Sequence, residues 1–78
     1  VVLYTLELGR LATEIEKVRM SDRPGRMVHM TATVEAYDTV LLTCCRTVGL
    51  TVPDRRPPLA ADERLEAELA LLARGVEW

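Results

Sequence analysis

Residues 24–48, PGRMVHMTATVEAYDTVLLTCCRTV, decide the fold of this chain. Apolar side chains recur along this stretch at alternating spacings of three and four, as in a helix that buries one stripe against a neighbour. More apolar residues flank the stripe than one partner helix would cover. We therefore predict a helix over residues 23–48 at the centre of a bundle, with a stripe formed by Met27, Met30, Val34, Tyr37, Leu41, Cys44 and Val48.

A second helix is predicted over residues 2–20, where the same alternation of spacings recurs. Its apolar stripe consists of Tyr4, Leu8, Leu11, Ile15 and Val18. The intervening sequence SDRPG is short and has the composition of a turn that leads into a helix. A link of this length makes the two helices antiparallel, so we expect an αα-hairpin.

The rest of the chain predicts a Pro-rich connector over residues 51–59 and a third helix over residues 60–74. Gly49-Leu50 and Gly75-Val76 each resemble a helix stop in which glycine takes the left-handed conformation. We expect the third helix to run antiparallel to helix 23–48, with Leu41 opposite Leu72 and Trp78 near Val34 and Glu35. Its predicted stripe is Leu65, Leu69, Leu72 and Val76. The predicted fold is an all-α, antiparallel three-helix bundle in a single domain, residues 1–78.

Composition argues against several classes of protein. A formal net charge of −2 and a pI near 5.3 argue against a nucleic-acid binder. We expect no membrane association, because no apolar run approaches the roughly 18 residues of a membrane span and no signal peptide opens the chain. Cys44 and Cys45 are adjacent in a predicted helix, where their side chains diverge and an intrachain disulfide would be strained. We therefore expect reduced thiols and a cytoplasmic protein, while the sequence leaves open whether Val1 is the true start.

Three carboxylates form a candidate metal site. Glu35 and Asp38, in the sequence EAYD, share part of one helix face, and the hairpin register places them level with Glu7 and Arg10. Helical bundles build metal sites from such carboxylates on facing helices.

The same residues carry a resemblance to the all-α nucleotide pyrophosphohydrolases of the MazG type, over about 45 residues. In that family E-x-x-E on one helix and E-x-x-D on another bind magnesium. The resemblance implies magnesium at Glu7, Glu35 and Asp38. Here Arg10 stands where the second glutamate belongs, which removes a ligand and adds repulsion. The competing interpretation is that these are solvated charges, with Arg10 paired to Glu35.

Cations gather around the predicted turn, where the N-terminus of helix 23–48 adds a positive dipole. Arg19, Arg23 and Arg26 are therefore candidates for binding an anion such as phosphate. The alternative is that basic residues in the last turn of helix 2–20 only complement its dipole.

Surplus apolar residues are the main functional signal. Val28 and Leu42 are two heptads apart on a further face of helix 23–48, and such a stripe can pack on its own copy across a two-fold axis. We expect a small interaction or regulatory protein without catalysis or cofactor, acting as a homodimer through Val28 and Leu42. A different protein partner and a divergent MazG-like, magnesium-dependent hydrolase are the alternatives. The residues outside the predicted stripes are Leu3, Leu6, Val28, Leu42 and Leu71.

Overall fold

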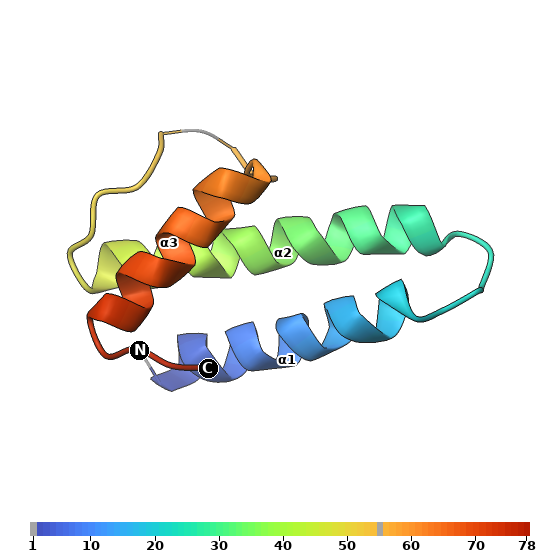
Figure 1. The fold of residues 1–78 in the computed structure, drawn as a ribbon, viewed down its shortest axis with the longest axis horizontal. Helices are drawn as coiled ribbons and strands as arrows, with labels where there is room; N and C mark the ends of the chain where they lie inside the picture. Colours follow the sequence, from blue (N-terminus) through green and yellow to red (C-terminus); the bar gives the residue numbers. More distant parts are fainter. Residues whose placement is uncertain (1, 55) are drawn as a thin grey trace.

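The computed structural model describes residues 2–54 and 56–78, which form three helices and contain no strand (Figure 1). The helices are α1 (Val2–Arg19), α2 (Arg26–Thr47) and α3 (Ala61–Ala73). The predicted all-α fold, a long αα-hairpin plus a shorter C-terminal helix, is confirmed. No helix among the described residues combines the length and apolar character needed to cross a membrane.

The hairpin of α1 and α2 is the longest part of the molecule, and the two helices pack along each other (Figure 1). α2 begins at Arg26, three residues later than predicted, because Gly25 precedes it with φ 80° in the left-handed region. A left-handed residue cannot continue a right-handed helix, so Pro24 belongs to the turn and not to the first helical turn.

Both predicted glycine stops are present. After α2, the Gly49 N–H donates to the Arg46 carbonyl at 3.0 Å and the Leu50 N–H to the Cys45 carbonyl at 2.9 Å. After α3, Gly75 and Val76 make the equivalent bonds to Leu72 and Leu71 at 2.9 and 3.1 Å. Because φ is 84° at Gly49 and 80° at Gly75, each stop uses the conformation that glycine adopts without steric cost.

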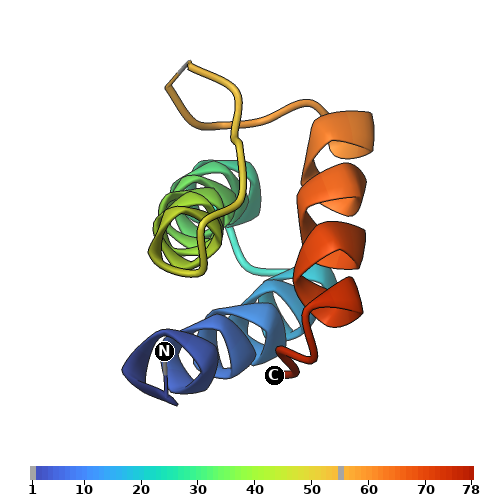
Figure 2. The same cartoon turned by 90° about the vertical axis from the view of Figure 1, so that its left-hand side faces the viewer.

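The hairpin forms one layer, and α3 lies across one face of it (Figure 2). α3 crosses α2 obliquely and runs in the same general direction, since Arg64 bonds to Asp38 near its start and Arg74 to the Val48 carbonyl near its end. The predicted antiparallel matching of the third helix with α2 is therefore wrong. The reason is that the connector returns along α2, and its Leu59 N–H already binds Asp38 in the middle of that helix.

α3 also buries a different face from the predicted one. Leu71 is fully buried and Ala67 is nearly so, whereas Leu65, Leu69 and Leu72 are 55%, 56% and 48% exposed. The predicted contact of Leu72 with Leu41 is thus replaced by the neighbouring Leu71. Ala67 is small enough to let the two backbones approach, and the Cys45 Sγ lies 3.9 Å from the Ala67 carbonyl oxygen.

The core forms between the hairpin helices and under α3 and the connector. Leu42 and Leu71, which the sequence placed outside the stripes, are both buried because α3 and Leu59 cover that side of α2. Trp78, expected near Val34 and Glu35, lies close to Tyr37, one helical turn after Val34, and its carbonyl carbon also approaches Gly9 of α1. The buried apolar residues are Leu8, Leu11, Val18, Tyr37, Leu41, Leu42, Cys44, Cys45, Leu59, Ala67 and Leu71.

The observed orientation of α3 can be tested with two adjacent leucines. Leu71→Ala removes a fully buried side chain and should lower the free energy of unfolding by about 2–5 kcal/mol. Leu72→Ala, on a half-exposed neighbour, should cost less than about 1 kcal/mol in dilute protein. Urea denaturation followed by circular dichroism measures both values. The reverse order would restore the stripe that the sequence predicted.

Candidate functional site

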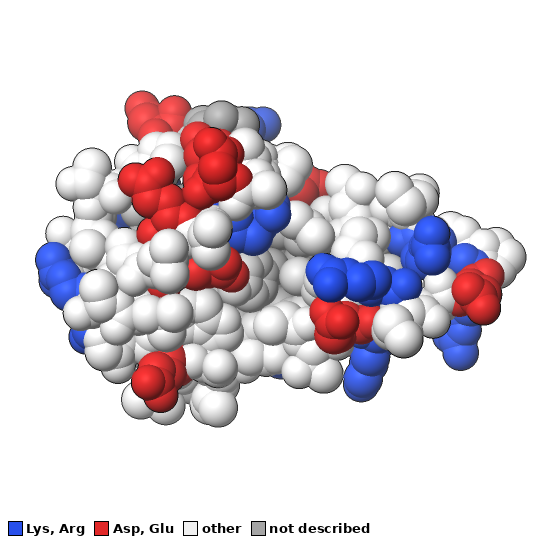
Figure 3. All heavy atoms as spheres, viewed as in Figure 1, with Lys and Arg blue, Asp and Glu red and all other residues white. Residues whose placement is uncertain are grey.

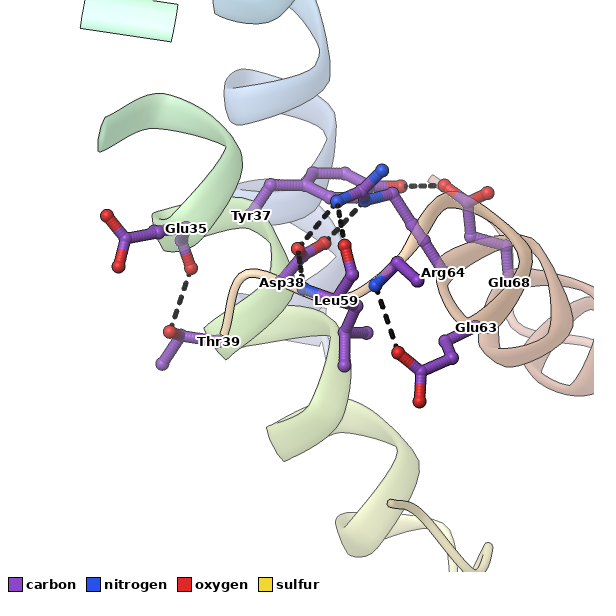
Figure 4. A network of polar contacts seen from close by, with 9 residues as sticks. Glu35, Tyr37, Asp38, Thr39, Leu59, Glu63, Arg64 and Glu68 are labelled. Atoms are coloured by element: carbon purple, nitrogen blue, oxygen red, sulfur yellow. Dashed lines mark hydrogen bonds and ion pairs between the residues drawn. The ribbon is translucent and has the colours of Figure 1, made fainter. Parts of the chain in front are cut away.

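The best-connected polar group in the molecule is the Asp38 clasp, which we define as Asp38, Leu59 and Arg64 (Figure 4). The Asp38 carboxylate accepts from Arg64 Nε at 2.6 Å, from Arg64 Nη2 at 2.8 Å and from the Leu59 N–H at 2.8 Å. Arg64 Nη2 also donates to the Leu59 carbonyl at 3.0 Å. The clasp therefore joins the middle of α2, the end of the connector and the first turn of α3.

The clasp has the properties of a structural ion pair. Asp38 is fully buried, and the Arg64 side chain is 24% exposed. A buried carboxylate is stable only when its lone pairs are met by hydrogen bonds and its charge by a cation. Its hydrogen bond to Asp38 raises the pKa of Arg64, so the guanidinium keeps its charge. Within the described residues, no buried side-chain nitrogen or oxygen lacks a hydrogen-bond partner.

A second polar contact joins α2 and α3 beside the clasp. The Tyr37 hydroxyl donates to the Glu68 carboxylate, and Glu68 lies one helical turn after Arg64 (Figure 4). Burial, reinforced by the bond to Glu68, raises the pKa of Tyr37 far above its usual value. The phenol is therefore protonated and acts as a donor at neutral pH.

The three candidate metal ligands have separate surroundings. Glu7 pairs with Arg10 on its own helix, chiefly through a hydrogen bond that lowers the pKa of Glu7. Arg10 is thus paired with Glu7, not with Glu35 as the competing interpretation had it. Asp38 is engaged in the clasp, and Figure 4 shows the exposed Glu35 carboxylate directed away from it. Throughout the described residues, no three His, Cys, Asp or Glu side chains form a group that could hold a metal ion.

The candidate anion ligands are divided between two hollows. Arg23 and Arg26 line a hollow of about 370 Å³ at the hairpin turn, together with Lys17 and His29. Arg26 also donates to the Ser21 carbonyl at 3.4 Å. Arg19 lines a different hollow beside α3 and pairs with Glu16 at 3.3 Å. Anion binding therefore stays a prediction for Arg23 and Arg26, and Arg19 does not belong to that group.

The two cysteines belong to the core. Cys44 and Cys45 are free thiols with almost no exposed surface. Burial raises the pKa of both thiols. Because the thiolate is the reactive form, these side chains act as small apolar residues and not as nucleophiles.

α3 also carries exposed apolar side chains. The α3 leucine face, defined as Leu65, Leu69 and Leu72, points away from the core. The α3 groove, a hollow of about 280 Å³, lies between α3 and the hairpin. Its apolar lining includes Ala12, Ile15, Met30 and Val34, and its charged rim is Glu16, Arg19, Arg64 and Glu68.

The dimer stripe expected from Val28 and Leu42 is not available on the surface. Val28 is 77% exposed, as expected, but Leu42 is only 2% exposed. The prediction is wrong for Leu42, because α3 and the connector pack on the part of α2 that the sequence pattern left open. Leu42 is therefore part of the core and not of an exposed stripe.

Sequence reasoning missed Arg64 and considered Asp38 only as a solvated charge or, in the alternative, a metal ligand. A signal was present, since Asp38 precedes Leu41 and Leu42 by three and four residues and so shares their helix face. A carboxylate on a buried face needs a cationic partner, and Arg64 is the one cation within α3.

Comparisons of the chain with protein-family models, curated proteins and solved structures gave no match.

Removing the charge of Asp38 tests whether the clasp holds the fold. Asp38→Asn keeps the shape of the side chain but leaves the partly buried Arg64 charge uncompensated. We expect the free energy of unfolding to fall by roughly 2–4 kcal/mol. This is less than for a fully buried ion pair, because the Arg64 side chain is partly exposed to solvent. Glu35→Gln, on an exposed carboxylate of the same helix, is the matched control and should change stability by less than about 0.5 kcal/mol. Equal effects of the two variants in urea denaturation would contradict a structural clasp.

Proposed function

We propose that this chain is a small, non-catalytic interaction module of the cytoplasm that acts as a homodimer. The observation that carries the proposal is the α3 leucine face beside the α3 groove. Three large apolar side chains with about half their surface in water, near a hollow with a partly apolar lining, are the kind of exposed apolar surface that favours an interaction site.

The energetics favour a partner for this surface. Completing the burial of a half-exposed leucine contributes about 1 kcal/mol, so the three leucines together favour association by several kcal/mol before its entropic cost. A chain of 78 residues also buries a smaller fraction of its surface on folding than a larger domain does. Association buries additional apolar surface, and a domain of this size has only a small core to stabilise it.

The state of the carboxylates supports a non-catalytic role. Glu7 pairs with Arg10, and Asp38 pairs with Arg64 and the Leu59 N–H. A magnesium ion at Asp38 would have to displace an arginine that holds α3 in place. The magnesium-dependent hydrolase therefore ranks behind the interaction module.

Sedimentation velocity tests the homodimer. The unmodified protein should sediment as a dimer at high micromolar concentration and dissociate on dilution, because the patch is small compared with obligate interfaces. A monomer throughout that range would reject the homodimer and leave the apolar surface for a different protein.

Calorimetry tests the absence of metal-dependent catalysis. Titration with magnesium or manganese should give no site tighter than millimolar, and nucleoside triphosphates should remain intact, because Arg10 and Arg64 occupy the candidate ligands. Glu35→Gln is the diagnostic variant. Release of pyrophosphate by the unmodified protein, abolished in Glu35→Gln, would replace this proposal with the hydrolase.

A further inference from the structure

α3 covers only part of the hairpin face on which it lies. The hydrogen bonds that join α3 and Arg74 to α2 and Val48 extend from Tyr37 to Val48. The first half of α2 and the opposing part of α1 extend beyond α3 toward the hairpin turn (Figure 1). The α3 groove lies at this boundary, where the covered half of the hairpin meets the uncovered half.

The α3 leucine face has the spacing of a helix that docks in a groove. Figure 3 faces this side of the molecule, and the surface drops beside α3. Leu65, Leu69 and Leu72 are spaced by four and three residues, as are the side chains with which an amphipathic helix enters an apolar groove. The leucine face cannot enter the groove of its own chain, because the opposite side of α3 is fixed by the clasp and by Leu71.

We propose that the α3 leucine face of each copy docks in the α3 groove of a second copy, across a two-fold axis. This arrangement rests on the homodimer proposed above and specifies its geometry. The two-fold axis turns one copy end for end, so that its α3 lies over the uncovered half of the partner's hairpin. Two identical helix-in-groove contacts then form at once, which doubles the buried area and closes the assembly.

The distribution of charge identifies a second copy as the occupant. Four cations but a single carboxylate, Asp22, lie between residues 17 and 26 at the hairpin turn. α3 has the opposite balance, with four carboxylates and the single cation Arg64. Figure 3 shows red over α3 and blue toward the turn. An end-for-end arrangement brings the acidic helix of each copy toward the basic hairpin turn of the other, and this attraction favours association.

A charged substitution on the leucine face tests the contact. Leu69→Glu should weaken the dimer roughly 30-fold or more in sedimentation equilibrium, because it places a carboxylate at the centre of the docked face. Leu3→Glu is the matched control, since Leu3 is 79% exposed and lies nine residues, about two and a half turns, before Ala12, on the opposite side of α1. Circular dichroism should show both variants helical. An unchanged Leu69→Glu dimer, or equal weakening by Leu3→Glu, would overturn the geometry.

Disulfide trapping tests the reciprocal pairing. A Leu69→Cys variant mixed with a Met30→Cys variant should form a mixed disulfide dimer several-fold faster than either variant alone. The unmodified protein is the control for Cys44 and Cys45, whose burial should keep them unreactive. Preferential linking of Leu69→Cys to itself, or no linking in a protein that sediments as a dimer, would reject this geometry and leave the homodimer standing. A monomeric unmodified protein would reject both.

Discussion

The buried charge of Asp38 is the constraint on which the rest of the structure depends. A carboxylate with no exposed surface needs several hydrogen bonds and a cation, and here all of them come from residues that are distant in sequence. Leu59 and Arg64 meet that need, so the connector must return to the middle of α2 before α3 begins. The direction of α3 follows from this return, since its first turn is held at Asp38 and its C-terminal end reaches Val48.

The clasp also selects which face of α3 is buried. The residues Arg64, Ala67 and Leu71 recur with helical spacing, and so do Leu65, Leu69 and Leu72. The second set is the more apolar, and burying it would favour folding by a few kcal/mol. Facing it inward would turn Arg64 away from Asp38, and an unpaired buried carboxylate costs at least as much. Leu71 and Ala67 are buried instead, and they replace part of the apolar burial that is lost because the leucine face points to solvent.

The sequence was sufficient where local rules decide the structure. The spacing of apolar residues predicted the three helices and the hairpin, and the glycines at 49 and 75 predicted the helix stops with their hydrogen bonds. It was insufficient for α3, because two helical stripes competed and the pair that chose between them is separated by 26 residues. The structural role of Asp38 was missed for the same reason, since the sequence offered only a solvated charge or a metal ligand and the arginine that pairs with it is 26 residues away.

On the proposed dimer geometry, folding and association would be linked through α3. The rotation that satisfies Asp38 inside the chain is the same rotation that leaves the α3 leucine face in water. The apolar burial lost inside the chain would then be recovered between chains, where the α3 leucine face of one copy would fill the α3 groove of the other. On the proposed geometry the clasp would serve both purposes, because Arg64 and Glu68 hold α3 in place and also form part of the groove rim. A change that loosened the clasp would therefore disturb the groove together with the helix that fills it in the partner.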